Sequence, residues 1–141
     1  MTTYAKRKKT MPLNKEMLQR IKEKILKEPE NFQMNYFTQF NTPCGTTACI
    51  AGWAVLLDAK DQGFEITKDW YQSLKSNVEQ LASGLLGLDY SEETEEGKIN
   101  SDTVFYVTDW PDDFKWRYKS ATSQEKRAHI AAKYIDYLCS L

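Results

Sequence analysis

Two cysteines flank a glycine-bearing turn that runs into an apolar stretch, and the first of them, Cys44, stands where a thiol nucleophile would be placed. We expect a buried helix to begin just after it, and the partial positive charge of a helix N-terminus lowers the pKa of a nearby thiol. A cysteine enzyme also needs a general base, normally histidine. The one histidine, His129, falls with Lys133 and Asp136 on a polar stripe of the last predicted helix, so we expect it to face water. Catalysis by Cys44 is therefore the alternative function, and Cys49 is expected to be an inert buried thiol.

The same turn has the features of a generic anion site. Gly45, Thr46 and Thr47 are expected to offer free backbone N–H groups at the start of the helix, where an anion is stabilised. The stretch is not a phosphate loop, because the Gly-x4-Gly-Lys-Ser/Thr pattern is absent. Asn41, a carboxylate such as Asp109, or water are alternative partners for the same N–H groups.

A Trp-Pro step supplies a second candidate for ligand binding. An exposed ring at Trp110 would stack on a base or clamp a partner, with Arg117 nearby on the following helix. The alternative is that Trp110 packs over the central helix and closes the core. We expect the tryptophans as a set to serve mainly in the core.

No metal or cofactor is expected from the residue pattern. Zinc needs four ligands at short paired spacings, which three cysteines and one exposed histidine do not supply. The four glutamates between residues 91 and 101 lack the ligand spacing of a calcium loop. A disulfide between Cys44 and Cys49 stays open on spacing alone, although an odd cysteine count favours free thiols in a reducing compartment.

The net charge of −1 is unevenly distributed. Four basic residues at positions 6–9 leave 15 basic against 20 acidic residues for the rest of the chain. The sequence suggests no further basic cluster, so we do not expect the folded core to bind duplex nucleic acid. Neither a membrane span nor a secretory signal is predicted, and a cytoplasmic protein is expected, in the host cytoplasm if a phage encodes it.

The elements that must position these residues are predicted to be helices. Asn14 caps a first helix that ends near Lys27, before the Glu28 and Pro29 step. Residues 31–40 are either a short helical turn or an extended segment. Residues 46–58 form a buried central helix with Thr46 or Thr47 as its N-cap, since residues 48–57 are apolar on every side.

The second half of the chain continues the pattern. A third helix spans residues 68–86 and stops at Gly87 in the left-handed position. Residues 91–101 form an exposed acidic excursion, and the β-branched run at 103–107 by itself suggests a strand. Pro111 opens the next helix, and a capping box at residues 122–125 opens the last one.

With these motifs in view, the chain resembles an uncharacterised family of small proteins from bacteria, cyanobacteria included, and their bacteriophages. The resemblance spans residues 11–138 and is carried mainly by the Cys-Gly-Thr-x-x-Cys-Ile-Ala-Gly-Trp motif at 44–53 and the Trp-Pro element at 110–111. Further matching positions are Glu28, Pro29, Phe32, Met34, Leu86, Gly87, Leu88, Val104, Phe105, Phe114, Tyr118, Ala121, Arg127, Ala128, Ala131, Ala132 and Ile135. The basic tail, the acidic insertion and Thr103-Val104 depart from the family pattern. The resemblance implies a helix at 102–107 and supplies no substrate.

These observations predict an all-α single domain, residues 11–141, of about five helices around the central helix at 46–58, preceded by a disordered basic tail at 1–10. The expected function is non-enzymatic binding of a protein or a small anionic ligand. The resemblance implies an accessory factor of a bacterium or phage, for which host-defence antagonism is one form. The expected ligand-binding residues are Gly45, Thr46, Thr47, Trp110 and Arg117, and the alternative is a thiol-dependent enzyme using Cys44.

Overall fold

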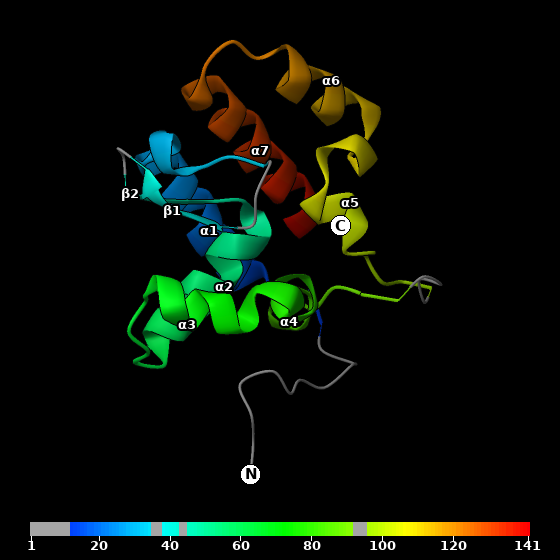
Figure 1. The fold of residues 1–141 in the computed structure, drawn as a ribbon. Helices are drawn as coiled ribbons and strands as arrows, with labels where there is room; N and C mark the ends of the chain where they lie inside the picture. Colours follow the sequence, from blue (N-terminus) through cyan, green and yellow to red (C-terminus); the bar gives the residue numbers. More distant parts are fainter. Residues whose placement is uncertain (1–11, 35–37, 43–44, 92–95) are drawn as a thin grey trace.

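The computed structural model describes residues 12–34, 38–42, 45–91 and 96–141, and within them the chain is mostly helical (Figure 1). The described part contains seven α-helices, three 3-10 helices and one two-stranded antiparallel sheet. The predicted all-α class is confirmed. The elements are α1 (Lys15–Lys27), η1 (Pro29–Asn31), β1 (Thr38–Thr42), β2 (Gly45–Ala48), α2 (Ile50–Asp61), α3 (Lys68–Leu74), η2 (Lys75–Asn77), α4 (Val78–Leu86), α5 (Asp102–Phe105), η3 (Val107–Asp109), α6 (Asp112–Ser120) and α7 (Gln124–Cys139).

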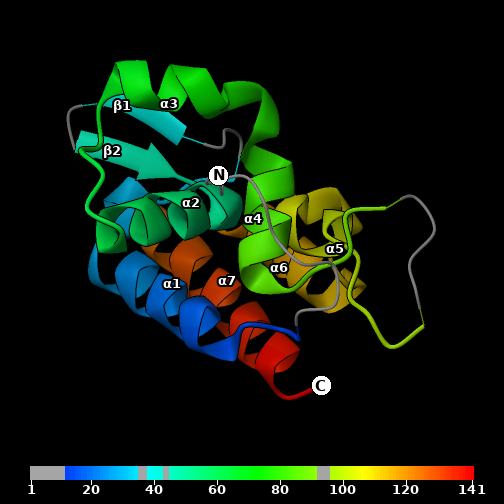
Figure 2. The same ribbon diagram turned by 90° about the horizontal axis from the view of Figure 1, so that it is seen from below.

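The core is one cluster of buried side chains to which α1, α2, α4, α5 and α7 all contribute. Figure 2 shows α1 and α7 side by side along one side of the molecule, with α2 next to α1. Eight of the twelve residues of α2 are buried, in keeping with its apolar composition on every side. The expectation of a buried helix here is confirmed, and α1, α4, α5 and β2 pack against it.

The central helix begins later than predicted. Residues 46–48 belong to β2, which pairs with β1 in the register Thr38 to Ala48 and Gln39 to Thr47. The N-cap of α2 is Cys49, whose sulfur accepts the backbone N–H of Gly52 at 3.5 Å. The prediction of Thr46 or Thr47 as N-cap is wrong, because β-branched threonines suit an extended strand and a partner strand is at hand.

Two further boundaries differ from prediction. The predicted helix at 68–86 is two helices, α3 and α4, joined by the 3-10 turn η2 at Lys75–Asn77, and Ser76 and Asn77 are poor residues for a helix interior. The strand suggested at 103–107 is wrong, since Asp102–Phe105 form the helix α5 and Val107–Asp109 form η3. The helix implied there by the family resemblance is the correct alternative.

Several predicted helix ends are confirmed. The side chain of Asn14 accepts the backbone N–H of Met17 at 3.0 Å, and α1 ends at Lys27. Gly87 ends α4 with φ of 73°. Ser123, rather than Thr122, caps α7, and α6 begins one residue after Pro111. The predicted tail at 1–10 and part of the acidic segment, residues 92–95, lie outside the described residues.

The burial of Gly52 in α2 predicts that a large side chain there overpacks the core. Gly52→Leu is expected to lower the free energy of unfolding by about 1–3 kcal/mol. The exposed Lys60 on the same helix supplies the control, and Lys60→Leu should stay within about 0.5 kcal/mol of the wild type. Urea denaturation of the three proteins makes the comparison, and equal stability of Gly52→Leu and wild type would contradict the burial.

Candidate functional site

The turn that the sequence singled out is not a helix N-terminus. Gly45 and Thr47 lie in β2, where they pair with Thr42 and Gln39 across the hairpin. The side chain of Thr47 is buried. The backbone N–H groups of residues 45–47 therefore do not point from the first turn of a helix toward a ligand, and the anion site predicted at Gly45, Thr46 and Thr47 loses its geometric basis.

The structure describes only one of the two cysteines of the turn. Cys44 lies outside the described residues, so its role as a nucleophile stays a prediction. Cys49 is 2% exposed, its sulfur accepts the N–H of Gly52, and burial raises the pKa of its thiol to about 11. His129 is exposed on α7, as expected. The predicted burial of Cys49 is thus confirmed, and its thiol is disfavoured as a nucleophile because the reactive species is the thiolate.

This environment predicts slow alkylation of Cys49 in the native protein. Iodoacetamide should modify Cys49 only when the protein is unfolded, whereas Cys139, which is half-buried near the C-terminus, should react earlier. Peptide mapping by mass spectrometry after a timed reaction at pH 6 and pH 8 measures each thiol separately. Modification of Cys49 at the rate of Cys139 would contradict its burial. In the same experiment, fast modification of Cys44 at pH 6 would support the thiol-dependent alternative.

The Trp-Pro element belongs to the core. Trp110 is 2% exposed, and its indole N–H donates to the carbonyl of Val104 at 2.9 Å. Its ring packs against Tyr134 and Tyr118, with centroid separations of 4.8 and 5.3 Å. The ring is therefore unavailable for stacking on a ligand, and the core alternative is correct. Arg117 is exposed on α6 and lines neither of the two cavities described below.

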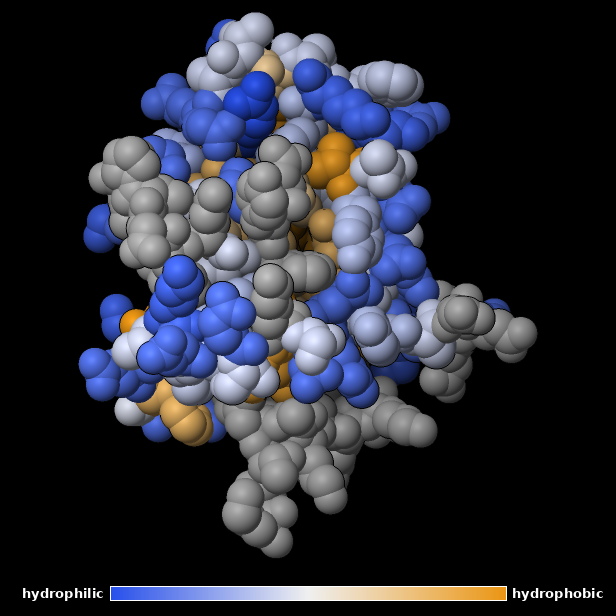
Figure 3. Space-filling model, viewed as in Figure 1, coloured by the Kyte–Doolittle hydropathy of each residue, from blue (hydrophilic) through white to orange (hydrophobic). Residues whose placement is uncertain are grey.

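A cavity of about 560 Å³ opens between four segments that are distant in sequence. Its lining comes from the segment after η1, the segment from Tyr106 into η3, the end of α6 and the start of α7. Figure 3, in the view of Figure 1, shows hydrophobic residues exposed among hydrophilic ones on this face of the molecule. We call it the Arg127 cavity, and its lining residues are Gln33, Met34, Tyr106, Val107, Thr108, Tyr118, Lys119, Gln124 and Arg127.

Hydrogen bonds hold the guanidinium of Arg127 in place. Ser123 caps α7, so Gln124 and Arg127 fall in the first turn and share one face of the helix. One terminal nitrogen of Arg127 donates to the side-chain oxygen of Gln124, and the other donates to the carbonyl of Ala121 at 3.1 Å. The amide of Gln124 in turn donates to the carbonyl of Phe32. A guanidinium carries five N–H donors, so this anchoring leaves donors for a ligand.

Two tyrosines form the aromatic part of the lining. Burial raises the pKa of Tyr118 to about 12, partly offset by the Arg127 charge and a hydrogen bond with the Met34 backbone. Tyr106 donates its hydroxyl to Glu79, and this hydrogen bond raises the pKa of Tyr106. Both phenols therefore stay neutral near pH 7. The formal charge of the cavity lining comes from Lys119 and Arg127, and both are positive.

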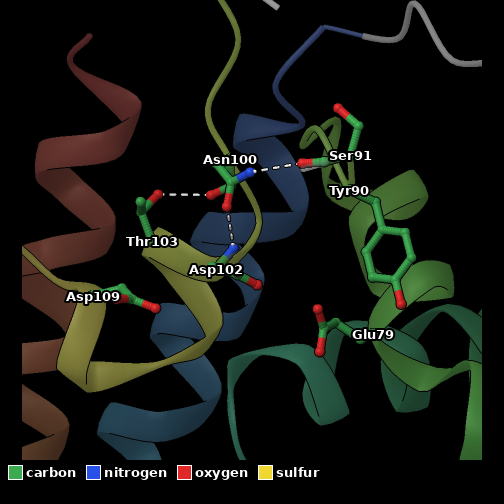
Figure 4. A pocket seen from close by; sticks show the side chains of 7 residues that line it. All are labelled: Glu79, Tyr90, Ser91, Asn100, Asp102, Thr103 and Asp109. Carbon is green, nitrogen blue, oxygen red and sulfur yellow. Dashed lines mark hydrogen bonds between the residues drawn. The ribbon is translucent and has the colours of Figure 1, made fainter. Parts of the chain in front are cut away.

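A second cavity, of about 620 Å³, has the opposite charge. Figure 4 shows the carboxylates of Glu79, Asp102 and Asp109 around it, together with Tyr90. Asn100 connects two segments of its lining. The side-chain amide of Asn100 donates to the Ser91 carbonyl, and its side-chain oxygen accepts the backbone N–H of Asp102. No group of three or more His, Cys, Asp or Glu in the described part of the chain is arranged to hold a metal ion. These carboxylates are thus a dispersed acidic surface.

No protein-family model, curated protein or solved structure matches this chain. Among the helices of the described residues, none combines the length and the apolar character needed to traverse a bilayer.

None of the residues lining the Arg127 cavity was predicted as a site residue. One sequence signal points toward it: residues 112–127 hold five basic residues against three acidic residues, and two of the basic ones, Lys119 and Arg127, line the cavity.

Proposed function

We propose that this chain is a binding protein that takes a small anionic ligand in the Arg127 cavity. The observation that carries the proposal is the charge of the lining. Lys119 and Arg127 contribute two positive charges, and the described lining residues include no carboxylate. In a chain with a net charge of −1, a cavity with this charge favours an anion over a cation.

The geometry supports an anchored anion rather than a loosely held counterion. Arg127 is half-buried, and its position is set by Gln124 and Ala121. A fixed guanidinium forms paired, charge-assisted hydrogen bonds with a carboxylate or phosphate, and less side-chain entropy is lost on binding. A volume of about 560 Å³ lies within the usual range for small-molecule sites.

The lining does not favour catalysis. The described residues around the cavity include no Cys, His, Asp or Glu, which are the usual nucleophiles and general bases. The alternative of a thiol-dependent enzyme depends on Cys44 and stays a prediction. The assignment to an accessory factor of a bacterium or phage depends on the family resemblance alone and stays a prediction as well.

Isothermal titration calorimetry of the purified chain with a matched set of small ions tests the proposal. Pyrophosphate and citrate are expected to bind with a stoichiometry of one, and the affinity should fall as the salt concentration rises. Erythritol, a small molecule without charge, is the control and should neither bind nor compete with pyrophosphate. The absence of binding by any anion, or displacement of pyrophosphate by erythritol, would overturn the proposal.

A further inference from the structure

The most exposed tryptophan of the chain, Trp116, precedes Lys119 by three residues on α6 and is not itself part of the lining of the Arg127 cavity. Trp116 on α6 is 61% exposed, whereas Trp53 and Trp110 are buried and Trp70 is half-buried. The ammonium groups of Lys115 and Lys119 lie 5.5 and 5.6 Å from the centroid of the Trp116 ring. These are cation–π contacts with the ring, so an anion that carries an aromatic group would be attracted by the two ammonium groups and could stack on the indole in place of one of them.

The surface around Trp116 carries an excess of positive charge. Five basic and three acidic residues occupy positions 112–127, from the start of α6 to the first turn of α7. Lys115 also forms an ion pair with Asp112 at 3.3 Å. The positive charge of this surface therefore comes mainly from the other basic residues. Its basic residues are Lys115, Arg117, Lys119, Lys126 and Arg127.

Lys119 connects the ring to the cavity. The same side chain lines the Arg127 cavity and places its ammonium group beside the ring of Trp116. An anionic group bound by Lys119 would therefore lie near the ring of Trp116, and a base that stacks on this ring takes the place of an ammonium group that lies over it. In a nucleotide, one sugar separates the phosphate from the base, so a single ligand has the two parts that these positions would bind.

We infer that the anion of the Arg127 cavity is a phosphate ester carrying a nucleobase, with the phosphate on Lys119 and Arg127 and the base stacked on Trp116. This inference rests on the proposed function and names its ligand class. A free mononucleotide and the end of a single-stranded oligonucleotide share this chemistry.

The test compares ligands that differ only in the base. Adenosine 5′-monophosphate and ribose 5-phosphate have the same sugar and phosphate, and calorimetry should give an affinity about tenfold higher for the nucleotide. In Trp116→Ala the ratio of the two affinities should fall close to one, while Trp116→Phe should keep part of it. Phe64→Ala, which removes another exposed aromatic side chain, should keep the wild-type ratio. Quenching of tryptophan fluorescence by the nucleotide should be lost in Trp116→Ala.

Each outcome bears on one claim. Equal affinity for both ligands, or an unchanged ratio in Trp116→Ala, would overturn the inference and leave anion binding in place. Binding of neither ligand, nor of pyrophosphate, would overturn the proposed function as well. A tetranucleotide with a 5′-phosphate distinguishes the two sources: tighter binding than the mononucleotide indicates a single strand, and weaker binding indicates a free nucleotide.

Discussion

Replacing Gly87 by alanine is expected to lower the free energy of unfolding by about 2–4 kcal/mol. Gly87 ends α4 with φ of 73°, a left-handed conformation that costs a residue with a Cβ about 1–2 kcal/mol. A Cβ at this position would lie 2.0 Å from the carbonyl oxygen of Pro12, so the backbone at Pro12 must also move. That backbone leads into Asn14, which donates to the carbonyls of Leu85 and Leu86. Urea denaturation followed by circular dichroism measures the loss.

Gly63 provides the matched control for this substitution. It has a similar φ of 84°, but a Cβ there would meet no heavy atom within 4 Å. Gly63→Ala should therefore show only the conformational cost of about 1–2 kcal/mol. The difference between the two variants isolates the contact between Gly87 and Pro12. Equal losses in the two variants would show that the close approach of α4 to the start of α1 contributes nothing.

Replacing Arg127 by alanine is expected to lower the affinity for pyrophosphate at least about tenfold. The substitution removes one of the two positive charges of the cavity lining, and with it the donor that Gln124 and Ala121 hold in position. Arg127→Lys keeps the charge but loses the forked arrangement of donors, so an intermediate affinity is expected. Isothermal titration calorimetry at one fixed salt concentration gives the three affinities.

Two controls separate binding from folding in this series. Lys133→Ala removes a positive charge from an exposed position of the same helix, outside the cavity lining, and should keep the wild-type affinity. Because Arg127 also donates a hydrogen bond to Ala121, at the start of the α6–α7 connection, the melting temperature of each variant must be measured. Unchanged pyrophosphate affinity in a folded Arg127→Ala protein would remove Arg127 from the site.

The helix ends that depend on local chemistry were predictable from sequence. The amide oxygen of Asn14 caps α1, Pro29 ends it, and the missing Cβ of Gly87 permits the left-handed end of α4. Each of these depends on one or two adjacent residues. The start of α2 was not predictable in this way, because Thr46 and Thr47 suit both an N-cap and a strand. Residues 45–48 form a strand because they pair with residues 38–42. The residues of the turn alone do not specify that pairing.

The candidate site was less predictable than the fold. The Arg127 cavity is assembled from four segments, and Met34, Val107 and Arg127 come together only through the packing of the chain. Trp110 was conspicuous in the sequence, but its hydrogen bond to Val104 and its contacts with two tyrosines place it in the core. Trp116 was not predicted as a site residue, because the sequence alone does not show which tryptophan side chains are exposed after folding.

The central claim, that a small anion binds in the Arg127 cavity, is tested most directly by nuclear magnetic resonance with pyrophosphate as the probe. The account predicts chemical-shift changes at the side-chain N–H groups of Gln33, Gln124 and Arg127, with saturation at one ligand per chain. The side-chain amide of Asn100, in the acidic cavity, should not shift. Shifts confined to other parts of the molecule, or no shifts at millimolar pyrophosphate, would contradict the account.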